Sequence, residues 1–373
     1  MSKASLYVNS KGYGVTRHSY SGSESFRFCA RKYYLERVQG WSEKVERAAK
    51  FFGIALEKAI TCYHQNGLNV SVAVADFCRL WAEHKDKQYE YSSKDGNWET
   101  LALSGPELVR LYALRYPTFP YTVPNPQDAF QVETTFEVFP GTKLAGIEFM
   151  SYIDLMAQVK DTFSPIIIDM KTSGLDIPEL IMLDPQLRSY SWVKQCPDVG
   201  FLWFRKCGRS LSKGDDVSLL ETYDGIEAGA EAVVLAKDDF GIWVTPDRRV
   251  VDEIDAKFKG QSKPVVAARQ AHIEANATHV PESIVTKQKV QFGHAVISPE
   301  SAEDIGRSIS RDIVNIHAAT EENVFPMQSG VRWPNDRCCN CVMRGICSGN
   351  SELRDQLVTR KQVDEFDFGK GNE

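Results

Sequence analysis

Apolar positions recur at helical spacing through most of the first third of the chain. After a polar start, Phe26 and Tyr33 lie two helical turns apart, and Ser21 and Ser23 precede them as good helix caps. This pattern predicts a helix that carries Cys29. Further helices are predicted over 48–65, 69–92 and 105–116.

After about residue 130 the helical spacing gives way to β-type runs. Three of them, separated by Pro140-Gly141 and by a polar turn, predict a meander of antiparallel strands. These runs cover 131–139, 143–159 and 165–172. Beyond them the pattern predicts a helix over 179–195, a strand over 199–206, a β-type stretch over 216–245, a helix over 247–275, a strand over 289–297 and a helix over 300–320. Helices on both sides of a central mixed sheet predict an α/β or α+β fold.

Composition adds that this is an ordinary soluble chain of 373 residues, of which 43% are hydrophobic. No apolar run is long enough to span a membrane, and the N-terminus lacks the apolar core of a secretory signal, so we expect a cytoplasmic protein with no membrane partner. A net charge of −6 argues against coating nucleic acid through bulk charge. The nine cysteines are then expected to be buried thiols or metal ligands rather than disulfides.

The stretch SPIIIDMKTSG carries the first candidate chemistry. Three isoleucines predict a buried strand, yet it ends in Asp169 and Lys171, which alternation places on one face. If the two strands form a tight hairpin through the turn at Asp161, Asp154 on the preceding strand lies beside Asp169, whereas a longer loop through Pro165 would shift this register by a step or two. Gln186 and Tyr190, four residues apart, share one face of the following helix.

Two carboxylates this close repel each other unless a divalent cation lies between them. Oxygen ligands favour Mg²⁺ or Mn²⁺ over zinc, and a neighbouring lysine can orient a water molecule or stabilise charge on a phosphate. The set therefore predicts phosphodiester hydrolysis. An isolated Asp-x-Lys could instead be a surface ion pair on an edge strand, but the buried strand and the second aspartate argue against that interpretation.

The order SYIDLM, IIIDMKTS and QLRSY resembles the PD-(D/E)XK nuclease superfamily, in particular its RecB-like branch. The resemblance implies a restriction-endonuclease-like core in which Asp154, Asp169 and the Met170 carbonyl bind the catalytic metal. It also implies that Lys171 is catalytic and that Gln186 and Tyr190 support the site or contact DNA. RecB-like members usually carry a histidine after G-x3, where this chain has Gly53 and Glu57. Glu57 could complete the metal shell as another oxygen ligand, or could be a solvated helix residue.

A second constellation, Cys338-x2-Cys341-x5-Cys347, lies in NDRCCNCVMRGIC. Three thiols at this spacing need a fourth ligand for a closed site, and Cys29 is the natural choice. Cys339 could compete as a ligand, although adjacent cysteines rarely both reach one metal, and Cys62, Cys78, Cys196 and Cys207 are expected to be buried, inert thiols. The arrangement resembles the iron-sulfur subgroup of RecB-like nucleases, including CRISPR-adaptation exonucleases and the AddB nuclease domain, and so implies a 4Fe-4S cluster. Zn²⁺ at the same four cysteines is the alternative. FCARKYYLERV departs from the subgroup's C-P-R-K-Y-Y only in having Ala30 for proline.

These patterns divide the chain into four segments. They are a helical region over 1–120 that carries Cys29 and Glu57, a nuclease core over 121–325, a cysteine segment over 326–350, and a polar, flexible tail over 351–373.

Basic residues flank the cysteines and provide candidate DNA contacts. Arg31, Lys32 and Arg37 follow Cys29, and Arg332, Arg337 and Arg344 surround the later cysteines, so a shared cluster would gather positive charge suited to a phosphate backbone. No base-reading motif is present, which predicts sequence-independent binding. No Walker motif is present either, so any unwinding requires a separate helicase partner.

The expected function is thus a metal-dependent DNA nuclease, in the first place an exonuclease of recombination, repair or phage replication, in a prokaryotic or phage setting. A non-catalytic DNA-binding or scaffold subunit of a nuclease-helicase complex is the alternative, favoured only by Glu57 in place of histidine. A zinc-ribbon transcription or RNA factor would leave Asp169 and Lys171 unexplained. The patterns leave cleavage polarity and homo-oligomerisation open.

Overall fold

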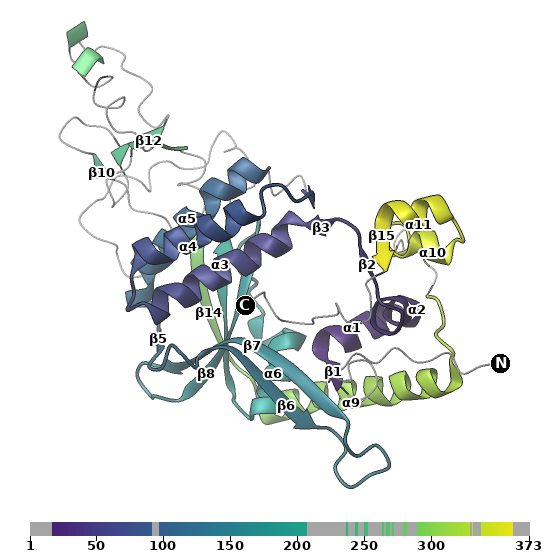
Figure 1. Cartoon of the computed structure of the whole chain (residues 1–373). Coiled ribbons are helices and arrows are strands. Elements are labelled where there is room, and N and C mark those ends of the chain that lie inside the picture. The colour runs from purple at the N-terminus through teal and green to yellow at the C-terminus, as the bar shows by residue number, and fades with distance from the viewer. Residues whose placement is uncertain are drawn as a thin grey trace.

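A computed structural model describes residues 17–91, 97–206, 289–328, 330 and 337–360, with short pieces between 236 and 281. Its centre is a mixed sheet in which β1 and β8 pair with successive stretches of one edge of β7, β5 and β6 pair with the other edge, and β9 lies between β8 and β14 (Figure 1). The strands are β1 (Arg17–Ser19), β5 (Tyr121–Thr122), β6 (Phe130–Glu137), β7 (Glu148–Val159), β8 (Pro165–Ser173), β9 (Asp198–Arg205) and β14 (Lys289–Val296). The predicted central mixed sheet with flanking helices is confirmed.

Two groups of helices cover the sheet and divide the core. On one face lie α3 (Ala48–Gln65), α4 (Val70–Glu83) and α5 (Trp98–Arg115), followed by the single turn η2 (Tyr116–Thr118). Apolar side chains of α3 such as Phe52, Leu56 and Ile60 are fully buried there with Ile166 and Ile168 of β8. On the other face, α6 (Pro185–Lys194) and α9 (Pro299–Glu322) pack with the intervening Ile167. The alternation along IIID therefore explains why β8 is buried on both faces.

The hairpin of β7 and β8 has the register expected from the sequence. Leu155 faces Ile168 and Gln158 faces Pro165, which brings Asp154 and Asp169 to the next opposing positions. In the described part of the chain the ladder between the two strands ends at Leu155. On the same edge of β7, the parallel strand β1 pairs only with Glu148 to Met150. The edge of β7 from Met150 to Leu155 therefore lies between β1 and β8. The point beyond Leu155 where β7 and β8 separate is called the fork.

The N-terminal helix differs from the prediction at Cys29. Ser19, rather than Ser21 or Ser23, caps α1 (Tyr20–Phe28) by accepting a hydrogen bond from Gly22 N. Cys29 is extended, with φ −167° and ψ 113°, and separates α1 from α2 (Ala30–Tyr33) and the π-helical turn η1 (Tyr34–Val38). Cys29 therefore lies at a break between helices instead of within one.

Other predicted boundaries also shift, for local reasons. The helix predicted over 69–92 ends at Glu83 because the chain turns back so that Tyr89 of β4 (Tyr89–Glu90) stacks on Phe51, and β4 pairs with β3 (Glu46–Arg47). The helix predicted from 105 begins at Trp98, capped by the side chain of Asn97. The helix predicted over 179–195 is split at Asp184, between η3 (Ile181–Leu183) and α6.

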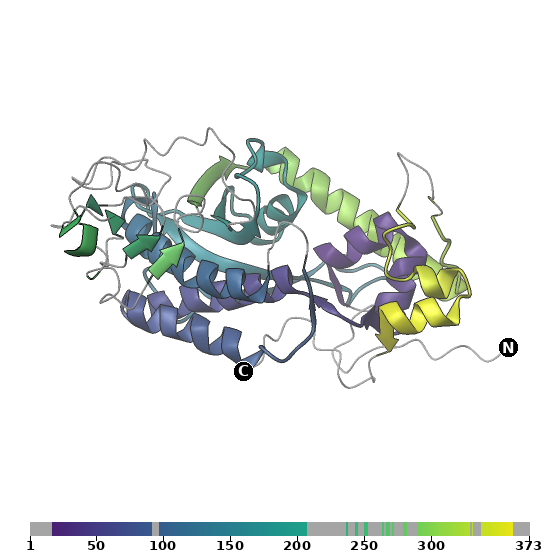
Figure 2. The same ribbon diagram turned by 90° about the horizontal axis from the view of Figure 1, so that it is seen from above.

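The segment expected to be a flexible tail begins with ordered structure. After α10 (Arg344–Cys347), Asn350 caps α11 (Ser351–Leu357), and β15 (Val358–Arg360) pairs antiparallel with β2 (Trp41–Glu43). Figures 1 and 2 both show α10 and α11 beside α2, so the two ends of the described chain form one unit. The expected flexibility is therefore wrong for these residues, and 361–373 lie outside the described part.

A four-stranded sheet lies between β9 and β14 in sequence, in the order β10 (Ala236–Lys237), β11 (Trp243–Val244), β12 (Val250–Asp252) and β13 (His279–Pro281). The predicted 216–245 stretch is described only at β10 and β11. Within the predicted helix over 247–275, β12 is a strand and residues 263–264, 266–268 and 271 are helical, while the rest lies outside the described residues. None of the helices in the described part combines the length and apolar character needed to cross a bilayer.

Candidate active site

Asp154 and Asp169 meet where β7 and β8 diverge. Beyond the last ladder pair, Asp154 Oδ2 accepts a hydrogen bond from Met170 N at 2.7 Å, which ties the two strands together through a side chain. Asp169 is 1% exposed, and Lys171 Nζ lies 2.7 Å from its Oδ2. The fork thus holds two aspartates and one lysine together, as the sequence register predicts.

Burial and mutual repulsion favour protonation of the carboxyl groups at the fork. Burial raises the pKa of Asp169, the charge of Asp154 raises it further, and Lys171 opposes this, with a net rise to about 7. Burial, followed by the charge of Glu57, likewise raises the pKa of Asp154 to about 7, although the Met170 N–H opposes the rise. The site therefore stabilises added positive charge near neutral pH.

A short hydrogen-bonded chain fixes the lysine. Lys171 Nζ donates to Gln186 Oε1 at 3.0 Å, and Gln186 Nε2 donates to Tyr190 OH at 2.6 Å. Burial lowers the pKa of Lys171, but Asp169 and the other carboxylates outweigh burial and leave it raised. Lys171 is therefore a fixed cation at neutral pH. It can orient a water molecule or stabilise a developing anion, but it is a poor proton acceptor.

Replacing Gln186 with leucine is expected to lower the DNA cleavage rate about tenfold to a hundredfold, because Lys171 would lose the partner that fixes its ammonium group. Single-turnover rates at saturating Mn²⁺ provide the measurement. Gln195→Leu, at the end of the same helix, serves as the control. An unchanged rate in Gln186→Leu would show that the lysine needs no support from α6.

Glu57 reaches the fork from α3. Gly53, one turn earlier, faces β8, where a Cβ would be in ordinary van der Waals contact with Thr172 Oγ1 at 3.4 Å. Burial raises the pKa of Glu57 to about 7, and the charge of Asp169 also raises it, against the effect of a hydrogen bond from Gln131. The structure therefore brings Glu57 into electrostatic contact with the aspartates. His64 lies in the core instead, where its ring bonds Tyr112 OH at 2.7 Å and burial lowers its pKa to about 4.

Gln131 is a site residue that the sequence does not reveal. It lies in β6 with φ at +52°, a left-handed conformation that costs a residue with a side chain some strain. Its amide donates to Glu57 Oε1 and also hydrogen-bonds Asp154. Gln131 thus links two of the acidic side chains. A glutamine with a left-handed backbone conformation cannot be recognised from the pattern of hydrophobic positions.

The donor chemistry at the fork fits a divalent cation with hard oxygen ligands. Glu57, Asp154 and Asp169 supply carboxylates, and the ammonium group of Lys171 shows that the fork already attracts a cation. Within the described residues, no three His, Cys, Asp or Glu side chains are gathered tightly enough to share an ion as they stand. Glu57, Asp154, Asp169 and the Met170 carbonyl therefore stay predicted ligands of Mg²⁺ or Mn²⁺.

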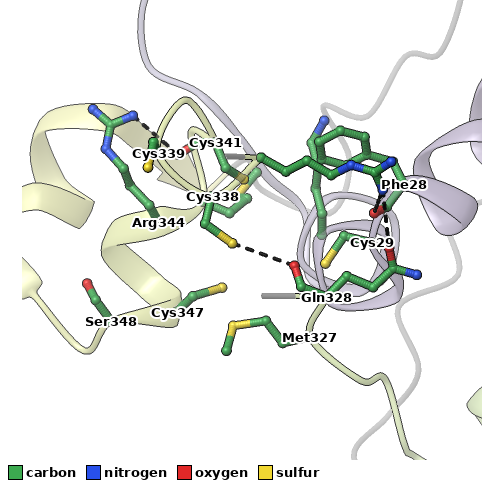
Figure 3. A pocket seen from close by; sticks show the side chains of 13 residues that line it. Phe28, Cys29, Met327, Gln328, Cys338, Cys339, Cys341, Arg344, Cys347 and Ser348 are labelled. Carbon is green, nitrogen blue, oxygen red and sulfur yellow. Dashed lines mark hydrogen bonds between the residues drawn. The ribbon is translucent and has the colours of Figure 1, made fainter. Parts of the chain in front are cut away.

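A second site lies at the joined ends of the chain, in a pocket of about 290 Å³. Cys29, Cys338, Cys341 and Cys347 all line it, so residues far apart in the sequence share one cavity. Figure 3 shows the sulfurs of Cys29, Cys338 and Cys347 directed toward the same space, and that of Cys339 turned away. Cys338 Sγ contacts the Gln328 carbonyl at 3.6 Å. The four predicted cysteines have the thiol chemistry for a 4Fe-4S cluster or Zn²⁺.

Burial raises the pKa of the Cys341 and Cys347 thiols, and nearby cysteines raise both further. Lys32, Arg337 and Arg344 line the same pocket and supply compensating positive charge. Arg337 also lies over the Phe28 ring at 5.1 Å.

The two predicted DNA contacts lie beside this pocket. Lys32 pairs with Glu36 at 3.4 Å, and the Arg31 guanidinium lies 5.2 Å from the centre of the Tyr34 ring. The structure therefore gathers basic residues at the cysteine end, as the sequence suggests. Their contact with DNA stays a prediction.

Sequence comparison adds a family to this geometry. The model of the PD-(D/E)XK nuclease superfamily matches residues 17–348, which include both aspartates, Lys171 and all five cysteines that line the pocket, Cys339 among them. A solved structure, that of SSO0001, is 12% identical with a TM-score of 0.26, over 80% of this chain and 84% of the other. No curated protein matches the chain. Because the family model spans most of the sequence, the chain belongs to the PD-(D/E)XK nuclease superfamily.

Proposed function

We propose that this chain is a metal-dependent DNA exonuclease that acts in recombination, repair or phage replication and that carries a 4Fe-4S cluster. The superfamily supports the coarser statement, a nuclease that generally uses Mg²⁺ or Mn²⁺. The observation that carries the proposal is the fork, where Asp154, Asp169 and Lys171 meet beside Glu57.

The roles of the residues follow from their places. Asp154, Asp169 and Glu57 would hold the cation, which when bound supplies Lewis acidity toward the phosphate and lowers the pKa of a water molecule. Lys171, held by Gln186 and Asp169, keeps its positive charge where a phosphate would lie. Tyr190 fixes Gln186 from α6. Lys171 would offset part of the negative charge that develops as water attacks phosphorus.

Binding is proposed to be independent of DNA sequence, through backbone contacts at Arg31, Lys32 and the other basic residues of the cysteine end. Unwinding would come from a separate helicase.

End-labelled DNA provides the test of the nuclease proposal. Linear and circular forms of single-stranded and duplex DNA are incubated with the full chain and Mn²⁺ or EDTA. Metal-dependent loss of linear DNA alone is the expected result, and the position of the label gives the polarity. Cleavage of circles would show an endonuclease. Binding without cleavage of any form would favour the non-catalytic scaffold subunit.

The cluster part of the proposal predicts about four iron atoms per chain after anaerobic purification, with a matching amount of acid-labile sulfide. Cys347→Ser is expected to lose most of the iron, because it removes one of four ligands that close the site. Cys78→Ser, at an exposed thiol on α4, is the control and keeps full iron content. One zinc atom per chain in place of iron would contradict the cluster proposal and support the structural Zn²⁺ alternative.

A further inference from the structure

A pocket of about 350 Å³ lies next to the catalytic residues, at the gap in the edge of β7. Met150, Tyr152 and Asp154 alternate along β7 and line it. In the described chain, β1 pairs with this edge up to Met150 and β8 resumes at Leu155, so the pocket occupies the interval between them. Gln186 and Tyr190 of α6 line it as well. The pocket therefore reaches the proposed active site at Asp154 and at the Gln186–Tyr190 pair that holds Lys171.

The opposite wall comes from the N-terminal helix. Tyr20, Ser21 and Glu24 of α1 line the pocket, as does Arg37 of η1, whose Nη2 donates to Ser21 Oγ at 3.4 Å. Burial raises the pKa of Tyr20, and the charge of Glu24, which lines the same pocket, raises it further.

We propose that this pocket takes one unpaired nucleotide at the end of a DNA strand, next to the phosphate that is cleaved. The proposal rests on the nuclease function proposed above and adds the form of the substrate. It commits the enzyme to single-stranded or frayed ends, because the last nucleotide must leave its base pair before it can enter.

The size of the pocket supports a single nucleotide. Small-molecule sites in proteins start at about 300 Å³, so this pocket is near the lower limit and has no room for a base pair with two backbones. Enzymes that act on one nucleotide commonly take it out of the stack into a close-fitting pocket. A blunt duplex end would have to unpair first.

The chemistry of the lining also matches a nucleotide. Tyr20 and Tyr152 supply aromatic surface, on which any base can stack. Ser21 and Glu24 supply a hydroxyl and a carboxylate for base edges, and Arg37 supplies a cation for a phosphate oxygen. Stacking tolerates all four bases, which agrees with the sequence-independent binding proposed above.

The test uses DNA with 2-aminopurine, a base whose fluorescence rises when it is unstacked. Ca²⁺ replaces the catalytic metal so that binding is observed without cleavage. Fluorescence of a terminal 2-aminopurine on single-stranded DNA is expected to change markedly on binding, relative to the same base at an internal position or at a blunt duplex end. Equal changes at all three positions would overturn the proposal.

Variants connect this signal to the pocket. Tyr152→Leu is expected to raise KM for single-stranded DNA about tenfold and to remove the terminal signal, because it removes an aromatic face. Tyr152→Phe keeps the aromatic ring, so its KM and its terminal fluorescence signal should match those of the unaltered protein. Phe163→Leu, an exposed aromatic at the β7–β8 turn, is the control. An unchanged KM and terminal signal in Tyr152→Leu with a folded protein would contradict the assignment.

The experiments distinguish a failure of this pocket proposal from a failure of the proposed nuclease function. If Mn²⁺ gives no cleavage of any DNA but the terminal signal appears, the nucleotide pocket stands and the nuclease proposal fails. If DNA is degraded equally well from blunt and single-stranded ends without a terminal signal, the nuclease stands and the pocket proposal fails.

Discussion

Lys171→Met is expected to lower the rate of metal-dependent DNA cleavage by about a thousandfold or more, because it removes a fixed positive charge from the site where phosphate charge develops. Methionine keeps the length of the side chain, so the packing against Gln186 is largely preserved. The rate is measured in single turnover with saturating Mn²⁺, where it reports the chemical step rather than product release.

The matched control is Lys194→Ala, at the last turn of α6, which is expected to cleave like the unaltered protein. The cleavage rate of Asp169→Asn should fall as far as that of Lys171→Met, since both variants remove the same ion pair. The two defects should not multiply in the double variant, because residues that act as a unit are strongly non-additive. Near-normal cleavage by Lys171→Met would show that the residues at the fork do not carry out catalysis.

The metal-free protein is expected to lose stability as pH rises from about 4 to about 7, and Mn²⁺ should restore it above that range. The pKa of Asp169 is raised from 3.8 to about 7 in the folded chain. The folded state therefore binds this proton more tightly than the unfolded state, and the stability that the proton provides is fully present only below about pH 4. A rise of this size corresponds to about 4 kcal/mol for Asp169 alone.

Urea unfolding at about pH 5 and about pH 8, with and without Mn²⁺, checks this linkage. Mn²⁺ should stabilise the protein far more at the higher pH, where the carboxylates are ionised and ready to bind it. Asp169→Asn should flatten the pH dependence and raise the metal-free stability at the higher pH. Equal stabilisation by Mn²⁺ at both pH values would mean that the acidic cluster is not the metal site.

The antiparallel pairing of β6, β7 and β8 could be predicted from the sequence because it depends on local alternation and short turns. Three isoleucines require burial on both faces of β8, and of the registers that the turn allowed, the tight one pairs Leu155 with Ile168. That register is also what brings Asp154 to Asp169. The acidic pair and its lysine were therefore readable from spacing alone.

Features that depend on distant segments could not be predicted in this way. At the fork β8 separates from β7 beyond Leu155, and β1, from the start of the described chain, pairs with the same edge of β7 only up to Met150. The left-handed Gln131 and the pairing of β15 with β2 are likewise set by tertiary contacts. The break at Cys29 falls within a favourable helical pattern and shows no local sequence signal. The resemblance to a nuclease family located the chemistry but not these connections.

The joining of the two ends at the cysteine pocket also has a consequence for protein synthesis. Cys29 leaves the ribosome early, whereas Cys338, Cys341 and Cys347 follow roughly 300 residues later. At about 5–20 residues per second, the first thiol waits roughly 15–60 s for its companions. The pairing of β15 with β2 comes later still. A nascent chain therefore has to keep Cys29 reduced while the nuclease core folds, and the pocket is completed last.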